Sequence, residues 1–344
     1  MKPATVRELR AEMPEKWIPD AVGILGRLES LLAGGLHIGF IERRSGIKEA
    51  ALHALLDAEG RAQLGTHEGS GLGGRNLHEE VEYLFRLQCW LDEFAAERLQ
   101  KARDYTEIPT GLYISGIAME ALENKRLFHL IGGYGISKTK TLERFAQAHP
   151  MTHETPGVAY FTLTDEDRTT TQIYQRISDA MRVNEKFAVH GRSLGQRIRN
   201  ALRAGDLLII DEANYAFERG SWTTLRDIFD GGPASMMLVS NTTSNGFVKS
   251  HQKELGAFLS RARTRIINKN QPDDGEKYAL ALGYTTPTII EEARKMVSKP
   301  GPTGGMRFIA KAFEDAERMA SEKGQPVDLK ILRDAAKMNS LFFR

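Results

Sequence analysis

The hydrophobic and polar positions along this chain follow a helical period near its start and an alternation of short apolar runs with helical stretches further on. Residues 21–32 place their apolar side chains on about one face of a helix, which predicts a short packing or interaction helix. Apolar residues recur every three or four positions over residues 77–102, which predicts a long helix. Short apolar runs then follow at 127–131, 157–164, 207–210 and 235–239, and they predict the strands of an α/β domain.

Residues 38–56 resemble a helix-turn-helix of the repressor type. Gly46 would supply the tight turn, and Ile47 and Leu52 would form the core between the two helices. A second helix that lies in a DNA major groove would need exposed polar residues, here Lys48, Glu49 and His53. Plain helical packing is the alternative, because many helical hairpins share this spacing.

Breaks in periodicity divide the chain. A glycine-rich stretch at residues 60–76 predicts a loop or flexible linker, and Pro109-Thr110-Gly111 precedes the first predicted strand. The predicted organisation is an N-terminal helical, helix-turn-helix-like domain with its linker (1–76), a connecting helix (77–108), a three-layer α/β core (109–272) and a C-terminal helical lid (273–344).

The apolar run at 127–131 leads directly into a glycine-rich turn that fits the phosphate-binding P-loop. In this pattern backbone N–H groups surround the phosphates, Lys138 reaches the β and γ oxygens, and the Thr139 hydroxyl completes a Mg²⁺ shell. The helix that follows would favour an anion at its N-terminus. The predicted nucleotide-binding residues are Gly132, Gly133, Tyr134, Gly135, Ile136, Ser137, Lys138, Thr139 and Lys140.

Ser137 is the departure from the P-loop pattern, because a glycine is expected at that position. A Cβ atom there could crowd the phosphates. The predicted ATPase is therefore slow, and weak nucleotide binding or binding without brisk hydrolysis is the alternative.

Four apolar residues at 207–210 end in Asp211 and Glu212, about 70 residues after the P-loop. This Walker B pattern predicts a central parallel strand that presents Asp211 to Mg²⁺ and Glu212 to the attacking water. Asn241 ends the next apolar run and could orient water at the γ-phosphate, or could simply be a turn residue.

Arginines complete the predicted catalytic set. Arg261 or Arg263 could reach the nucleotide of a neighbouring subunit as an arginine finger, and surface ion pairing is the competing explanation. Arg307, near a predicted helix start in the lid, is a candidate second sensor. The segment 110–114, just before the P-loop, is a candidate for contact with the base.

The net charge of +2 conceals an uneven distribution: residues 1–108 hold 14 Lys and Arg against 18 Asp and Glu, and residues 109–344 hold 33 against 27. Contact with nucleic acid is therefore expected in the ATPase region at least as much as before it. Candidate phosphate contacts are Arg168, Thr169 and Thr170 in a polar loop, and Arg192, Arg197 and Arg199 in a segment without acidic residues. For the polar loop, the alternative is a solvated loop in which a threonine caps the next helix. For the arginine segment, the alternative is a basic helix face exposed to solvent.

The composition, 41% apolar and 27% charged, is ordinary for a globular protein. The sequence contains neither a secretory signal nor an apolar stretch near 18 residues, so nothing in it points to a membrane. The single cysteine, Cys89, excludes an internal disulfide and a CxxC metal or redox site. The reducing cytoplasm of a bacterial or phage-infected cell is the expected location.

Taken in order, these motifs and the lid sequence Gly-Gly-Met-Arg at 304–307 resemble the AAA+ ATPases of DNA transposition, the target-capture group of MuB, TnsC and IstB. The likeness is one of motif order and length, strongest over residues 110–315. It implies an AAA+ P-loop domain of three αβα layers that uses ATP and Mg²⁺. It also implies sequence-independent binding to duplex DNA, assembly into oligomers or helical filaments, and activation of a DDE transposase.

Residue roles carried over from that resemblance agree with those of the motifs. Lys138 and Thr139 would hold phosphate and Mg²⁺, Asn241 would sense the γ-phosphate, and Arg307 would report from the lid. Two rivals stay open. One is a helicase-loader-like replication ATPase, and the other is a helix-turn-helix DNA-binding regulator whose nucleotide site does not hydrolyse ATP.

Overall fold

A computed structural model of the chain describes residues 20–33, 35–56, 77–152, 154–182, 191–242, 252–301 and 303–341. The chain divides into two units, Met1–Lys101 and Ala102–Arg344, and each has its own core. None of the helices in the described ranges is both long and apolar enough to cross a membrane.

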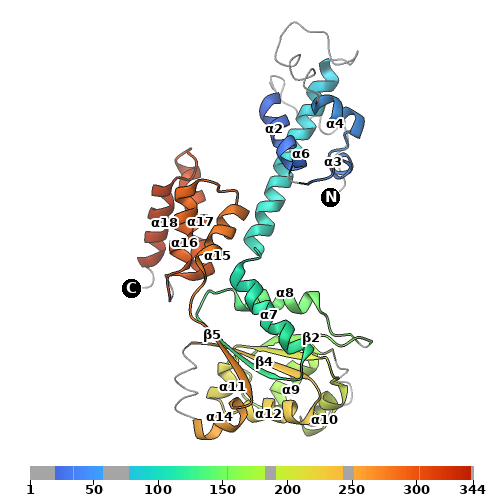
Figure 1. The fold of residues 1–344 in the computed structure, drawn as a ribbon, viewed down its shortest axis with the longest axis vertical. Coiled ribbons are helices and arrows are strands. Elements are labelled where there is room, and N and C mark those ends of the chain that lie inside the picture. The colour runs from blue at the N-terminus through green and yellow to red at the C-terminus, as the bar shows by residue number, and fades with distance from the viewer. Residues whose placement is uncertain are drawn as a thin grey trace. The chain divides into compact units, whose positions relative to one another are not determined.

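Unit 1 is helical (Figure 1). It contains α2 (Ala21–Ala33), α3 (Ile38–Ser45), α4 (Glu49–Leu56) and most of the long helix α6 (Leu77–Asp104). The shorter helices bury their apolar faces against α6, where Trp90 stacks on Phe94 with ring centroids 5.3 Å apart. The predicted amphipathic segments therefore form one shared core.

The α3–α4 hairpin has the turn and the buried residues that the sequence predicts at this place, and a role in DNA recognition stays a prediction. Gly46 adopts a left-handed conformation, with a φ of 70°, and its N–H closes α3 on the carbonyl of Glu42. Ile47 and Leu52 are fully buried. The outer face of α4 is exposed at the predicted positions, Lys48, Glu49 and His53.

Unit 2 is built on a five-stranded sheet in the order β2-β3-β4-β1-β5, in which every neighbouring pair is parallel. Its strands are β1 (Leu127–Gly132), β2 (Val158–Thr162), β3 (Leu207–Asp211), β4 (Ser235–Asn241) and β5 (Ala262–Ile267). Each of β1, β3 and β4 has neighbours on both sides, and β1 and β3 are buried throughout, as continuous apolar runs predict.

Helices cover both faces of this sheet (Figure 1). Alternate strand residues serve the two faces, because successive side chains in a strand point in opposite directions. Leu207 and Ile209 pack with α7 (Pro109–Glu123) and α8 (Lys138–Ala148). Leu208 and Ile210 pack with α9 (Thr170–Ala180), α10 (Gly191–Ala201), α11 (Asn214–Glu218), α12 (Trp222–Gly231) and α14 (Gln252–Leu259). The predicted three-layer αβα fold is confirmed.

The C-terminal helical lid contains α15 (Pro272–Ala281), α16 (Pro287–Val297), α17 (Gly305–Glu322) and α18 (Leu329–Leu341) around a separate apolar core. A buried carboxylate ties it to the sheet domain. Asp274 at the start of α15 accepts hydrogen bonds from the backbone N–H of Thr110 at 2.8 Å and from Asn270 Nδ2 at 2.7 Å. The first turn of α7 and the first turn of the lid are thereby held together.

The sheet domain buries a histidine on its interior strand β1. His129 on β1 is 2% exposed, its Nε2 lies 2.9 Å from the hydroxyl of Ser240, and burial lowers its pKa to about 4. The folded protein therefore keeps this imidazole neutral at a pH where the unfolded chain, with a pKa near 6.5, would take up a proton.

We expect this histidine to make the protein less stable as the pH falls from about 6.5 to 4. Its contribution is fully present above the unfolded pKa and is lost as the pH drops through the folded value, for a total of about 3 kcal/mol. Urea unfolding of the wild type and of His129→Gln at several pH values measures it. Both proteins contain the same carboxylates, so any difference in the pH dependence of their free energies of unfolding comes from His129. If the two free energies changed with pH in parallel, the lowered pKa of His129 would be contradicted.

Candidate nucleotide-binding site

The P-loop joins the end of β1 to the start of α8 at the carboxyl edge of the sheet. A close contact with the backbone requires Gly133, because a Cβ there would lie 2.9 Å from the carbonyl oxygen of Asn268. A Cβ at Gly132 would meet the side chains of Ile136 at 2.5 Å and Lys138 at 2.8 Å. Ser137 has a φ of 68° and a ψ of 18°, the left-handed conformation that the expected glycine would adopt without strain. The loop thus keeps its shape despite the substitution.

Lys138 is half-buried inside the loop. Its Nζ donates hydrogen bonds to the carbonyl oxygens of Gly132 at 2.8 Å and of Gly133 at 2.9 Å. Burial lowers the pKa of this amine, and the charges of Asp211 and Glu212 act in the opposite direction. The ammonium group is therefore held at the loop beside two carboxylates.

Thr139 and Asp211 meet across the sheet. The Thr139 hydroxyl donates to Asp211 Oδ2 at 2.7 Å, although β4 lies between the strands that lead to the two residues. Asp211 Oδ1 accepts the backbone N–H of Glu212 at 2.9 Å. A hydroxyl and a carboxylate at this distance form the pair of oxygen donors that Mg²⁺ shares with nucleotide phosphates.

Tyr160 is a third partner of Asp211 that the sequence motifs did not reveal. From β2, its hydroxyl donates to Asp211 Oδ2 at 3.0 Å and lies 3.2 Å from the hydroxyl of Thr162. Burial and the Asp211 charge raise the pKa of this phenol, so it stays protonated and can donate. Only strand pairing brings it here, so no local pattern could have identified it.

Glu212 follows β3 in a left-handed conformation, with a φ of 53°. Burial raises the pKa of its carboxyl, the Asp211 charge raises it further, and Lys138 opposes both. A non-glycine residue in this conformation is strained, and such residues cluster at functional sites. The carboxylate is suited to accept a proton from water.

The remaining predicted residues of the site come from β4 and the lid. Asn241 is paired in register with Gly132 at the end of β4. The backbone N–H of Met306, at the start of α17, donates to the carbonyl of Gly135 at 2.8 Å. This bond places Arg307 next to the loop, where its charge influences both Lys138 and Glu212.

The two candidate arginine fingers lie elsewhere in the subunit. Arg263 on β5 forms an ion pair with Glu120, and Arg261 forms one with Asp230. Both are near the amino end of β5, whereas the P-loop extends from the carboxyl ends of the parallel strands. A role at the nucleotide of a neighbouring subunit stays a prediction.

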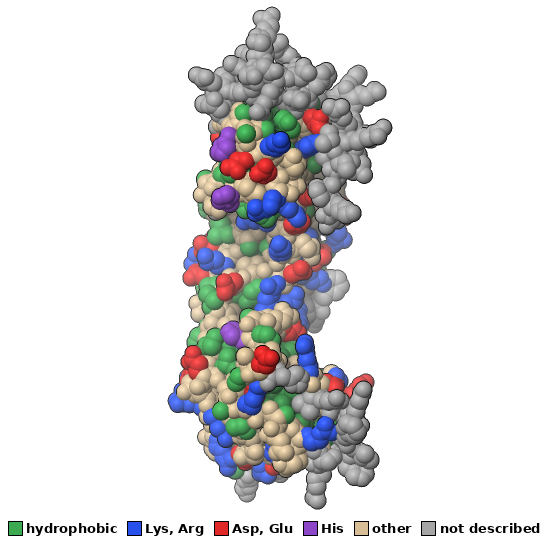
Figure 2. Space-filling model, turned by 90° about the vertical axis from the view of Figure 1, so that its right-hand side faces the viewer, with side chains coloured by type: hydrophobic (Ala, Val, Ile, Leu, Met, Phe, Trp, Pro, Cys, Tyr) green, Lys and Arg blue, Asp and Glu red, His purple; other side chains and the backbone are tan. Residues whose placement is uncertain are grey.

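The predicted DNA contacts are partly engaged within the chain. Thr169 caps α9 in a capping box with Gln172, and Arg168 pairs with Asp165 at 2.6 Å. The hydroxyl of Thr170 accepts a hydrogen bond from Thr224 at 3.1 Å. Arg197 and Arg199 are half-buried on α10, and the side chain of Arg192 lies outside the described residues. On the face in Figure 2, basic and acidic side chains are interspersed.

The segment 110–114 forms the first turns of α7. Thr110 and Ile114 are buried, and Thr110 bonds to Asp274, whereas Leu112 and Tyr113 are about half-exposed. Contact with a base stays a prediction for this segment.

Comparison with known proteins agrees with this geometry. Residues 121–243 match the family model of an AAA domain. The matched range contains the P-loop, the Asp-Glu strand and Asn241, while Arg307 and the lid lie beyond it. The matched range therefore covers four of the five strands of the sheet, together with Lys138, Thr139 and Asp211.

Three solved structures have a chain trace similar to part of this chain. The ORC2 protein of Aeropyrum pernix, in ADPNP–ADP complexes, is 14% identical with a TM-score of 0.49 over 67% of this chain and 66% of that one. Domain III of the Thermotoga maritima replication initiation protein DnaA is 16% identical, with a TM-score of 0.46 over 69% and 95%. The Aeropyrum pernix ORC1 protein, in complex with DNA, is 14% identical, with a TM-score of 0.47 over 67% and 64%.

The match thus covers slightly less than two thirds of the length of the two Aeropyrum pernix proteins. A search of the curated proteins found no match.

We expect Ser137→Gly to bind ATP about 3- to 10-fold more tightly than the wild type, since it removes both the strained conformation and the Cβ atom beside the phosphates. Titration with a fluorescent ATP analogue measures the change. Ser137→Ala is the matched control because it keeps the Cβ atom and the strain. Equal affinity of the two variants would contradict the explanation.

We expect Tyr160→Phe to raise the Mg²⁺ concentration needed for half-maximal nucleotide binding about 3- to 10-fold, because Asp211 loses one of its donors. Binding of nucleotide without Mg²⁺ should not change. Tyr284→Phe is the control, since it removes a similar bond, from Tyr284 to Glu317 at 3.1 Å, inside the lid. An unchanged Mg²⁺ requirement in Tyr160→Phe would show that Tyr160 does not position Asp211.

Proposed function

We propose that this chain is an ATP-regulated ATPase that binds duplex DNA without sequence preference, assembles on it and activates a transposase. The observation that carries the proposal is the contact between Thr139 and Asp211, with Lys138, Glu212 and Arg307 around the same loop. These residues come from the P-loop, β3 and the lid. Because residues from three separate parts of the chain meet at one loop, the site favours nucleotide binding and turnover over a relic that no longer hydrolyses ATP.

The donor set fits ATP with Mg²⁺. Bound Mg²⁺ would neutralise charge on the β and γ phosphates. Thr139 and Asp211 would hold the ion, and Lys138 would hold the phosphate oxygens. Glu212 would accept a proton from the attacking water, and its raised pKa brings it closer to the operating pH of a general base. Arg307 would supply positive charge from the lid.

The contact between the lid and the P-loop supports regulation of assembly by ATP. Met306 and Arg307 adjoin Gly135 through the 2.8 Å backbone bond, so the first turn of α17 would sense what the loop holds. A lid that changes with the nucleotide could present different surfaces to neighbouring subunits. This supports assembly in the ATP state and release after hydrolysis.

DNA binding is proposed from the charge and exposure of side chains, and the transposase partner from the order of the motifs. The excess of basic residues after residue 108 and the exposed face of α4 favour contact with nucleic acid. The transposase comes from the resemblance in motif order alone. A helicase loader would share the same site, so the partner enzyme has to be found by experiment.

The test is binding of the purified protein to several unrelated duplex DNAs with ATP, with ADP and without nucleotide, at two salt concentrations, together with negative-stain imaging. We expect ATP-dependent, salt-sensitive binding to every duplex, with oligomers or filaments, because phosphate contacts release counterions. Lys138→Ala should abolish both. Lys277→Ala, which removes an exposed amine on α15 outside the predicted nucleotide and DNA contacts, is the matched control.

Nucleotide-independent binding to one preferred sequence without assembly would overturn the proposal and favour a helix-turn-helix regulator. Assembly on DNA that stimulates a replicative helicase and no transposase would favour the helicase-loader alternative.

A further inference from the structure

The end of the long helix α6 is attached to the helix that carries the P-loop lysine. Residues 102–108, which end α6 and lead to α7, belong to unit 2. Lys140 Nζ donates a hydrogen bond to the backbone carbonyl of Asp104 at 3.0 Å, and the guanidinium carbon of Arg144 lies 4.7 Å from the centroid of the Tyr105 ring. Both cationic side chains come from α8, so a displacement of α8 reaches the end of α6 directly.

The same end of α6 is attached to the lid. Arg103 forms an ion pair with Oε2 of Glu317 on α17, and Oε1 of Glu317 accepts a hydrogen bond from the hydroxyl of Tyr284 at 3.1 Å. Burial and the Glu317 charge raise the pKa of Tyr284, so this phenol stays protonated and donates. Because both carboxylate oxygens have a donor and the Glu317 side chain is 23% exposed, this ion pair is held more firmly than an isolated pair on an open surface. Ile108 adds an apolar attachment, since it is buried in the core of the lid.

The two attachments lead to two different parts of the proposed nucleotide site. The helix α8 carries Lys138 and Thr139, whereas α17 carries Arg307 near its start. The phosphates of ATP would attract both positive charges, and loss of the γ-phosphate would release part of this attraction. The position of α17 relative to α8 would then differ between the ATP and ADP states. Since α6 is a single helix of 28 residues, a change in the separation of its two partners shifts or turns the whole helix.

The other turns of α6 hold unit 1 together. Arg27 of α2 pairs with Asp92 at 2.8 Å, and Arg44 of α3 pairs with Glu97 at 2.6 Å. The buried apolar residues that α6 contributes to the core of unit 1 are Leu84, Leu87, Trp90 and Leu91. The helices α2, α3 and α4 share this core, so they follow α6 when it moves.

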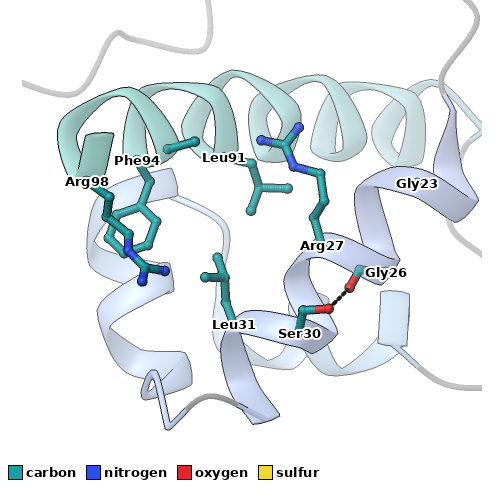
Figure 3. A pocket seen from close by; sticks show the side chains of 9 residues that line it. Gly23, Gly26, Arg27, Ser30, Leu31, Leu91, Phe94 and Arg98 are labelled. Carbon is teal, nitrogen blue, oxygen red and sulfur yellow. Dashed lines mark hydrogen bonds between the residues drawn. The ribbon is translucent and has the colours of Figure 1, made fainter. Parts of the chain in front are cut away.

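The helix α6 also forms one wall of an open groove of about 450 Å³ in unit 1 (Figure 3). The groove is lined by a stripe of α6 that runs from Leu91 to Arg98 and by a stripe of α2 that runs from Gly23 to Leu31. The groove and the α3–α4 hairpin thus lie on helices that α6 carries. A movement of α6 would change where unit 1 presents both features.

We propose that α6 is a lever that transmits the state of the nucleotide to unit 1, with the ion pair between Arg103 and Glu317 as its attachment to the lid. The inference rests on the proposed function, because it requires that the P-loop binds ATP and ADP. It adds that unit 1 occupies different positions in the two states. Hydrolysis of ATP at the sheet domain would thus change what the exposed face of α4 can reach.

The distance between a label on unit 1 and a label on the sheet domain tests the lever. His53→Cys on α4 and Gly116→Cys on α7 place labels at exposed positions, and Cys89→Ser removes the single native cysteine. A Cβ at Gly116 meets no atom within 4 Å, so the label fits there. Spin labels on the full-length protein report the distance with a non-hydrolysable ATP analogue and Mg²⁺, and with ADP and Mg²⁺. We expect the two mean distances to differ by about 3 Å or more, since a long helix amplifies shifts of about 1–2 Å at its end.

Equal distances in a protein that binds both nucleotides would overturn the lever and leave the proposed function standing. A wild type that binds neither nucleotide would overturn both.

Arg103→Ala tests the attachment to the lid. This variant should lose at least half of the distance difference, while its affinity for the ATP analogue changes less than about 2-fold. The affinity should hold because Glu317, the partner of Arg103, follows Arg307 by about 15 Å along α17. Arg318→Ala is the matched control, since its ion pair with Asp315 at 2.7 Å stays within α17, and it should keep the full difference. A full difference in Arg103→Ala would overturn the proposal.

A charge reversal separates the ion pair from a general effect on folding. Arg103→Glu alone should lose the distance difference, and the combination of Arg103→Glu with Glu317→Arg should recover at least half of it. A defect in folding would not be corrected by the second change. If the double variant has the circular dichroism of the wild type and recovers nothing, the ion pair is not the attachment of the lever.

Discussion

The hydrogen bond from Thr139 to Asp211 is the interaction on which the candidate site depends. It joins the P-loop after β1 to the end of β3 across the intervening strand, β4. It can form only if the three strands are parallel and end at one edge of the sheet, as their register requires. β1 and β3 are apolar along their whole length because helices pack on both faces of the sheet that contains them.

Strain accompanies this arrangement. Ser137 and Glu212 adopt left-handed conformations that glycine would adopt more easily, and they lie on either side of the Thr139–Asp211 pair. The rigid sheet and the buried helices on its faces supply the stability that offsets such local cost. Hydrogen bonds from Tyr160 and from the Glu212 N–H then fix the Asp211 carboxylate in place.

The two units have different chemistry. Unit 2 places the charged residues Lys138 and Asp211 and the strained residues Ser137 and Glu212 at the carboxyl edge of the sheet, and Gly135 connects this edge to the lid. Unit 1 has an apolar groove and an exposed helical hairpin, which are features of recognition surfaces.

The sequence by itself determined four of the five strands, the P-loop, the Asp-Glu strand and the α3–α4 hairpin, because each depends on local spacing that a few neighbouring residues encode. The tertiary structure alone decided that Tyr160 contacts Asp211, that the start of α17 bonds to Gly135, and that Arg261 and Arg263 pair with Asp230 and Glu120. It also decided where two helical stripes leave a groove. These contacts join residues far apart in the chain, and no local periodicity specifies which strand lies beside which.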